Sequence, residues 1–173
     1  MARIKLQDED TNDPEIHKIF KEIKAKAGKV PAAYRAFARH AHILQANWNR
    51  TKNILEKGNI DIKEKEAIAT RVSAANECHF CLAIHKGNLE KLGLNASDIQ
   101  SIEKNEVKDE KLNFVLKFVT TATKNPSKIT DHDFEKLKEF GYSEEDIVEI
   151  LTVMEMYTGY NKIIVALGLQ LED

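Results

Sequence analysis

The residues best suited to chemistry lie in one stretch of nine, ECHFCLAIH, at residues 77–85. It holds both cysteines of the 173-residue chain, Cys78 and Cys81, and two of its six histidines, His79 and His85. Two cysteines placed at random would fall three residues apart in only about one sequence in a hundred, and a reduced CxxC pair is typically catalytic, redox-active or metal-binding. The spacing therefore indicates either dithiol chemistry or a metal site.

A helix that begins at or just before Cys78 would place the two cysteines one turn apart on the same face, with His85 one turn beyond Cys81. Unpaired backbone amides and the positive end of the helix dipole favour an anion there, which lowers a thiol pKa from about 8.5 toward neutrality. A thiolate is the nucleophile, and a second thiol three residues away can close a disulfide after the first is oxidised. With an imidazole as base, the stretch has the parts of a dithiol redox centre.

Zinc binding is the main alternative on the residues alone. Cys78, Cys81 and His85 could be three ligands, with Glu66 or His79 as the fourth. Structural zinc sites usually add a second, distant pair of ligands, and the chain has no second CxxC and no HxxxH. A thioredoxin-type centre would need a βαβ unit, which the pattern lacks. We therefore expect no bound metal and no cofactor.

The elements that must position these residues are predicted to be helices throughout. Asp13 and Pro14 are typical of a helix start, an apolar stripe follows, and Gly28 is typical of a helix end. No segment shows strand alternation with hairpin turns. We expect an all-α fold of about eight helices, over residues 14–27, 34–57 with room for a break near residue 40, 61–76, 78–92, 96–104, 110–123, 130–140 and 143–167. The stretches at residues 60–94 and 142–169 resemble each other, so an organisation in two related halves is left open.

Composition places the chain in the globular class. Hydrophobic residues make up 42%, charged residues 31%, and the formal net charge is −2. These values argue against a basic footprint for nucleic acid, and no apolar run reaches the length of a membrane span. The N-terminus lacks the apolar core of a secretory signal, so we expect a cytoplasmic protein. Without a linker, we expect a helical extension at residues 1–27 and one domain at residues 28–173.

A longer motif includes the cysteines. Glu66, Cys78, Cys81 and His85 form the pattern Glu-x11-Cys-x2-Cys-x3-His. It resembles the signature of the alkylhydroperoxidase-D-like, or carboxymuconolactone decarboxylase, family. The segments at residues 28–44, 90–94 and 129–169 are also similar to that family, so the resemblance covers most of the chain from Gly28 onward.

The resemblance implies an alkylhydroperoxidase-D-like helical bundle, a homotrimer or homohexamer, and thiol peroxidase activity on organic hydroperoxides. It implies that Cys81 attacks the peroxide and becomes a sulfenic acid. Cys78 would be the more exposed partner that delivers a proton and closes the disulfide. Glu66 and His85 would form a proton relay to Cys81 through water. A lipoylated or thioredoxin-like dithiol protein would supply electrons.

One position departs from the best-characterised peroxidases of the family, which have a histidine directly before the second cysteine. Here that residue is Phe80, and His79 lies one position earlier. One residue is a rotation of about 100° on a helix, so we expect His79 to point elsewhere. An aromatic residue at this position resembles a second branch of the family, described as peroxidase-related.

The sequence thus predicts an enzyme, a thiol-dependent antioxidant peroxidase that reduces alkyl hydroperoxides. One alternative is a decarboxylase or isomerase in which Glu66 and His85 do acid–base work and the cysteines are incidental. The resemblance implies that the decarboxylase branch generally lacks the cysteine pair, so the cysteines favour the redox branch. Another is a redox-sensing or zinc-binding CxxC module. Tyr157, Tyr160 and Asn161 would approach the site only if the last helix faces it, and aromatic residues at helical spacing are more often core or interface.

Overall fold

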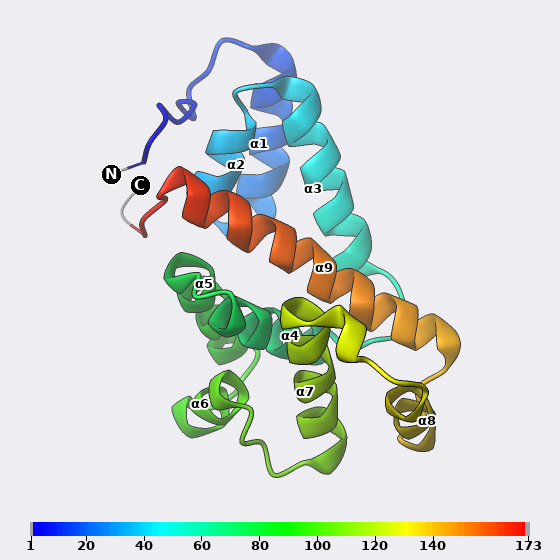
Figure 1. Cartoon of the computed structure of the whole chain (residues 1–173). Coiled ribbons are helices and arrows are strands. Elements are labelled where there is room, and N and C mark those ends of the chain that lie inside the picture. Colours follow the sequence, from blue (N-terminus) through cyan, green and yellow to red (C-terminus); the bar gives the residue numbers. More distant parts are fainter. Residues whose placement is uncertain (1, 172–173) are drawn as a thin grey trace. The chain divides into compact units, whose positions relative to one another are not determined.

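The computed structural model describes residues 2–171, which contain nine α-helices, one 3-10 turn and no strand (Figure 1). The helices are α1 (Pro14–Ala27), α2 (Ala32–Phe37), α3 (Ala41–Glu56), α4 (Ile62–Ala75), α5 (His79–Lys91), α6 (Ala96–Lys104), α7 (Glu110–Lys124), α8 (Asp131–Glu139) and α9 (Glu144–Leu167), with the 3-10 turn η1 at Pro126–Lys128. The predicted all-α class is confirmed. No helix within the described residues is both long enough and apolar enough to cross a lipid bilayer.

The chain forms two compact units. The first comprises the described residues up to Lys57 and from Ile164 onward, and the second comprises residues 58–163. Most of α9 therefore belongs to the second unit, and only its last residues belong to the first. The division expected after residue 27 stays a prediction.

The first unit contains α1, α2 and α3, and both shorter helices pack on α3. The Asp13 carboxylate accepts hydrogen bonds from the N–H groups of Glu15 and Ile16, at 2.9 and 3.1 Å. Gly28 ends α1 with a φ of +78°, a left-handed conformation that glycine adopts without steric cost. The break expected near residue 40 is present, because His40 is extended and separates α2 from α3.

The second unit is built around α4, which packs against α5, α6 and α7 (Figure 1). Nine of its 14 residues are buried, among them Ile68 and Val72, which are 0% exposed. A helix covered on several sides also buries polar side chains, and buried polar groups need hydrogen-bond partners. The buried polar residues of α4 are Lys65, Glu66, Thr70 and Ser73. The hydrogen-bond and ion-pair partners of these four side chains therefore determine the stability and the chemistry of this unit.

Lys65 pairs with Glu149 of α9. The Lys65 ammonium lies 2.6 Å from Glu149 Oε1, and the two side chains are only 2% and 16% exposed. Glu149 Oε2 accepts hydrogen bonds from the backbone N–H groups of Asn59 and Ile60, at 2.8 and 3.3 Å. Gly58 has a φ of +95°, and a Cβ there would overlap the Glu149 carboxylate. The carboxylate thus fixes both the loop before α4 and the first turn of that helix.

We expect Glu149→Gln to lower the free energy of unfolding by roughly 3 kcal/mol, because the buried ammonium loses the charge that compensates it. The amide oxygen can still accept from the loop, so the loss reports the charge. Urea denaturation of the whole chain measures it. The matched control is Glu145→Gln, an exposed position on the same helix, which should change stability by less than about 0.5 kcal/mol. Equal losses in the two variants would contradict this account.

Candidate active site

The turn between α4 and α5 carries the first cysteine. Glu77 has a φ of +56°, in the left-handed region, and Cys78 is the N-cap of α5 with a non-helical ψ of 85°. The N–H of Cys78 donates to the carbonyl of Ser73 at 3.0 Å, and its sulfur accepts from the N–H of Cys81 at 3.3 Å. Cys78 therefore provides a hydrogen-bond donor for a carbonyl at the end of α4 and an acceptor for an N–H group at the start of α5. The helix begins one residue after Cys78, because the left-handed residue before it turns the chain.

Cys78 and Cys81 are joined by a disulfide, with their Cα atoms 5.3 Å apart. The two residues are 1% and 3% exposed in this chain. The greater exposure of Cys78 that the family resemblance implied is therefore wrong for this state, since Cys78 is buried at the N-cap of α5. Sulfurs bonded to each other leave no thiolate for zinc. Within residues 2–171, no group of three or more His, Cys, Asp or Glu side chains is arranged to hold a metal ion.

Glu66 of α4 and His85 of α5 are in direct contact. His85 Nδ1 lies 2.8 Å from Glu66 Oε2, and the residues are 7% and 4% exposed. The other carboxylate oxygen accepts a hydrogen bond from Asn88 Nδ2 at 3.2 Å. An ionised carboxylate can only accept, so it holds a proton on Nδ1 and leaves Nε2 of a neutral ring as a base. Because His85 lies four residues after Cys81 on α5, its ring is on the face of the second cysteine.

The last helix also reaches the site. The edge of the Tyr157 ring packs on the His85 ring, with centroids 4.4 Å apart and an interplanar angle of 79°. One turn later, Asn161 is 0% exposed and donates from Nδ2 to Ser73 Oγ at 3.2 Å. Asn161 Oδ1 accepts from Asn76 Nδ2 at 3.1 Å. These two residues of α9 are therefore in contact with the site, and not simply core or interface residues.

Sequence reasoning missed Asn88 and favoured other roles for Tyr157 and Asn161. A signal existed for Asn88, which lies three residues after His85 and so on the same face of α5. Tyr157 and Asn161 share a face of α9, but only the packing of that helix reveals which face meets the cysteine turn. His79 is exposed, and the buried Phe80 occupies the position where the family's peroxidases have a histidine.

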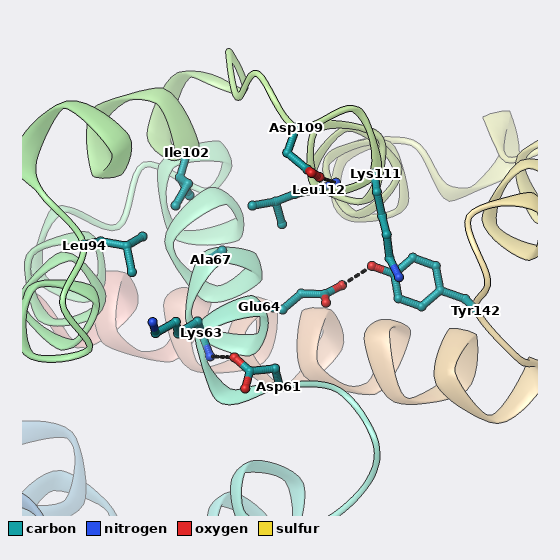
Figure 2. A pocket seen from close by; sticks show the side chains of 10 residues that line it. All are labelled: Asp61, Lys63, Glu64, Ala67, Leu94, Ile102, Asp109, Lys111, Leu112 and Tyr142. Atoms are coloured by element: carbon teal, nitrogen blue, oxygen red, sulfur yellow. Dashed lines mark hydrogen bonds between the residues drawn. The ribbon is translucent and has the colours of Figure 1, made fainter.

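A separate cavity of about 320 Å³ lies on another side of α4 (Figure 2). Ala67, Leu94, Ile102 and Leu112 form its apolar part, and neither cysteine lines it. Figure 2 shows the Glu64 carboxylate turned toward the Tyr142 hydroxyl, which donates to Glu64 Oε1 at 2.5 Å. The chemistry of the cysteine turn is thus physically separate from this cavity.

Asp61 and Glu64 have the spacing of a capping pair at the start of α4. Asp61 caps α4 through the N–H of Lys63, at 2.8 Å, while Glu64 turns to Tyr142 instead. Burial raises the pKa of Glu64 above its ordinary value of 4.5, and the hydrogen bond from Tyr142 only partly opposes that rise. Burial likewise raises the pKa of Tyr142, so its hydroxyl remains a donor.

We expect Glu64→Gln to remove one component of the pH dependence of stability. A raised pKa in the folded protein means that Glu64 contributes stability below about pH 4.5, which is lost as pH rises through the folded-state pKa. The neutral amide does not titrate, so the variant should gain stability relative to wild type as pH increases over that range. Urea unfolding at a series of pH values measures this. Parallel curves for the two proteins would contradict the assignment, and Glu110→Gln, exposed at the start of α7, should follow wild type.

The chain is similar to a known protein family and to several known proteins. Residues 31–108, which include both cysteines, Glu66 and His85, match the model of the carboxymuconolactone decarboxylase family. The uncharacterized protein YdfG of Bacillus subtilis (strain 168) is 28% identical over 119 residues, which are 65% of this chain and 79% of that protein.

Several solved structures share the fold. An uncharacterized peroxidase-related protein from Ralstonia eutropha JMP134, described as an alkylhydroperoxidase AhpD core, has a TM-score of 0.90 at 23% identity, over 99% of this chain and 93% of that one. A peroxidase-related protein from Silicibacter sp. TM1040 has a TM-score of 0.85 at 24% identity, over 98% and 91%. A variant of the debrominase Bmp8 in complex with 2,3,4-tribromopyrrole has a TM-score of 0.85 at 18% identity, over 99% and 94%. At these identities the likeness shows the fold.

Proposed function

We propose that this chain, whose residues 31–108 match the model of the carboxymuconolactone decarboxylase family, is a thiol peroxidase that reduces alkyl hydroperoxides. One observation carries the proposal: a CxxC pair at the start of α5 closes into a disulfide, and His85, one turn beyond Cys81 on the same helix, is buried in contact with Glu66 of α4. Acid–base chemistry alone would need the carboxylate and the imidazole but not two adjacent sulfurs.

In the first step, His85 Nε2 takes the proton of the reduced Cys81 thiol. The thiolate attacks the terminal oxygen of the hydroperoxide, the O–O bond breaks, and the leaving alkoxide takes a proton from the imidazolium to become an alcohol. Cys81 is then a sulfenic acid. Glu66 keeps the ring oriented and stabilises the imidazolium, in the way that a carboxylate supports a general-base histidine.

In the second step, Cys78 loses its thiol proton and its sulfur attacks the Cys81 sulfur. The S–O bond breaks, the disulfide forms, and the leaving hydroxide takes up that proton to become water. The N-cap position favours this role, because the N–H of Cys81 donates to the Cys78 sulfur and so stabilises a negative charge on it. Each sulfur thus has its own means of ionisation. The two electrons that reduce one peroxide come from the two thiols, and no cofactor takes part.

The oxidised pair must be reduced again by a second dithiol. The family resemblance favours a lipoylated or thioredoxin-like protein as donor and a homotrimer or homohexamer as the assembly. Both remain proposals for this chain, as does its antioxidant role in the cytoplasm.

The same residues could also support two other functions. In a decarboxylase or isomerase, Glu66 and His85 would act on a carbon acid, and serine at both cysteines would leave turnover intact. Reductive debromination is suggested by the similarity to Bmp8. There the Cys81 thiolate would take a bromine from carbon while that carbon takes a proton from the His85 imidazolium, and the Cys78 thiolate would then attack the Cys81 sulfur, closing the disulfide and releasing bromide. Neither alternative explains both the buried dithiol and its histidine better than peroxide reduction does.

We expect single-turnover reaction of reduced Cys78→Ser with cumene hydroperoxide to leave a sulfenic acid on Cys81, because the nucleophile is present and the resolving thiol is not. Mass spectrometry after trapping with dimedone locates it. In Cys81→Ser, Cys78 should react no faster than an ordinary thiol.

Oxidation confined to Cys78, with Cys81 unmodified in the Cys78→Ser variant, would reverse the two roles. A wild-type dithiol that ignores the peroxide but releases bromide from 2,3,4-tribromopyrrole would replace the peroxidase proposal with the debrominase one.

A further inference from the structure

Asn161 of α9 connects the last helix to the turn that carries Cys78. Its side chain is 0% exposed, as is that of Ser73, and the two are joined by the 3.2 Å hydrogen bond from Asn161 Nδ2 to Ser73 Oγ. The amide oxygen of Asn161 accepts from Asn76, the C-cap of α4. A single side chain thus contacts both Ser73, in the last turn of α4, and Asn76, its C-cap.

Ser73 transmits this contact to the cysteine. Its hydroxyl accepts from Asn161, while its backbone carbonyl accepts the N–H of Cys78 at 3.0 Å. Between Asn76 and Cys78 lies Glu77, whose φ of +56° is unfavourable for a residue with a Cβ. A backbone in that region persists only when its surroundings hold it. Asn161 is one of the surroundings that do so.

We propose that Asn161 is a positioning residue that sets the thiol–disulfide equilibrium of the Cys78–Cys81 pair by holding the turn at residues 76–78 in one conformation in both redox states. In the disulfide, the S–S bond itself fixes the distance between the sulfurs. After reduction that bond is gone, and the hydrogen bonds of Asn161 keep Cys78 at the N-cap and its sulfur near Cys81. The reduced pair therefore stays prearranged to close again.

The expected consequence follows from effective concentration. Two thiols held side by side form a disulfide more readily than two thiols on a mobile turn, because less freedom is lost on closure. Without Asn161 the reduced turn samples other conformations, and the disulfide becomes easier to reduce. Tyr157 lies one turn earlier on the same face of α9 and packs on His85, so a single helix face supports both the dithiol and its base.

The inference rests on the dithiol part of the proposed function but needs no peroxide, so the test uses glutathione alone. The whole chain is equilibrated with mixtures of reduced and oxidised glutathione, and the fraction of Cys78–Cys81 disulfide is counted by alkylation and mass spectrometry. Asn161→Leu removes both hydrogen bonds at similar volume. We expect the equilibrium constant for the disulfide to fall about tenfold, which is about 30 mV for a two-electron couple. Asn76→Ala removes one hydrogen bond and should shift it in the same direction by less.

The matched control is Tyr142→Phe, which removes a different hydrogen bond to α4 in the same unit, away from the cysteines. It should leave the equilibrium constant within about twofold of wild type even if it lowers stability. An unchanged constant in both Asn161→Leu and Asn76→Ala would overturn the inference, as would an equal shift in Tyr142→Phe. If Asn161→Leu does not fold, Asn76→Ala decides alone. Failure of wild type to reduce peroxide would sink the proposed function but not this result.

Discussion

The contact between Glu66 and His85 is the interaction on which the site depends. It joins the central helix of the second unit to the helix that carries the cysteines, with both side chains more than nine-tenths buried. A buried carboxylate needs partners for both oxygens, and Asn88 completes the set. The same contact fixes which ring nitrogen can act as a base. This one hydrogen bond therefore both joins the two helices and orients the imidazole. An apolar residue in place of Glu66 would remove both effects.

Three helices meet the cysteine turn, each with a different task. α4 supplies the carboxylate, and the left-handed residue Glu77 turns the chain after its C-cap. α5 supplies the N–H of Cys81, which donates to the Cys78 sulfur, and the imidazole of His85 one turn beyond Cys81. From α9, Tyr157 packs on the imidazole ring, and Asn161 donates a hydrogen bond to Ser73 near the turn. Such support from neighbouring elements is what keeps reactive groups within the small tolerances that catalysis demands.

Much of this could be predicted from sequence because it depends on local geometry. Helix caps, the break near His40, and the placement of Cys81 and His85 on one face follow from the 3.6-residue period. Glu66 was identified through the family's spacing, since its contact with His85 joins two helices. The contacts of Asn161 could not be predicted, because they depend on the rotation of α9 about its own axis. The burial of Cys78 was also missed, because it depends on tertiary packing around the turn.

The position of the proton on His85 tests the central claim most directly. Nitrogen-15 NMR of the reduced, histidine-labelled chain distinguishes the two neutral tautomers and the imidazolium. The Glu66 contact predicts that the neutral ring carries its proton on Nδ1 and leaves Nε2 bare to accept the Cys81 proton. A neutral ring with its proton on Nε2 would contradict the account, because such a ring could not accept the Cys81 proton from that side.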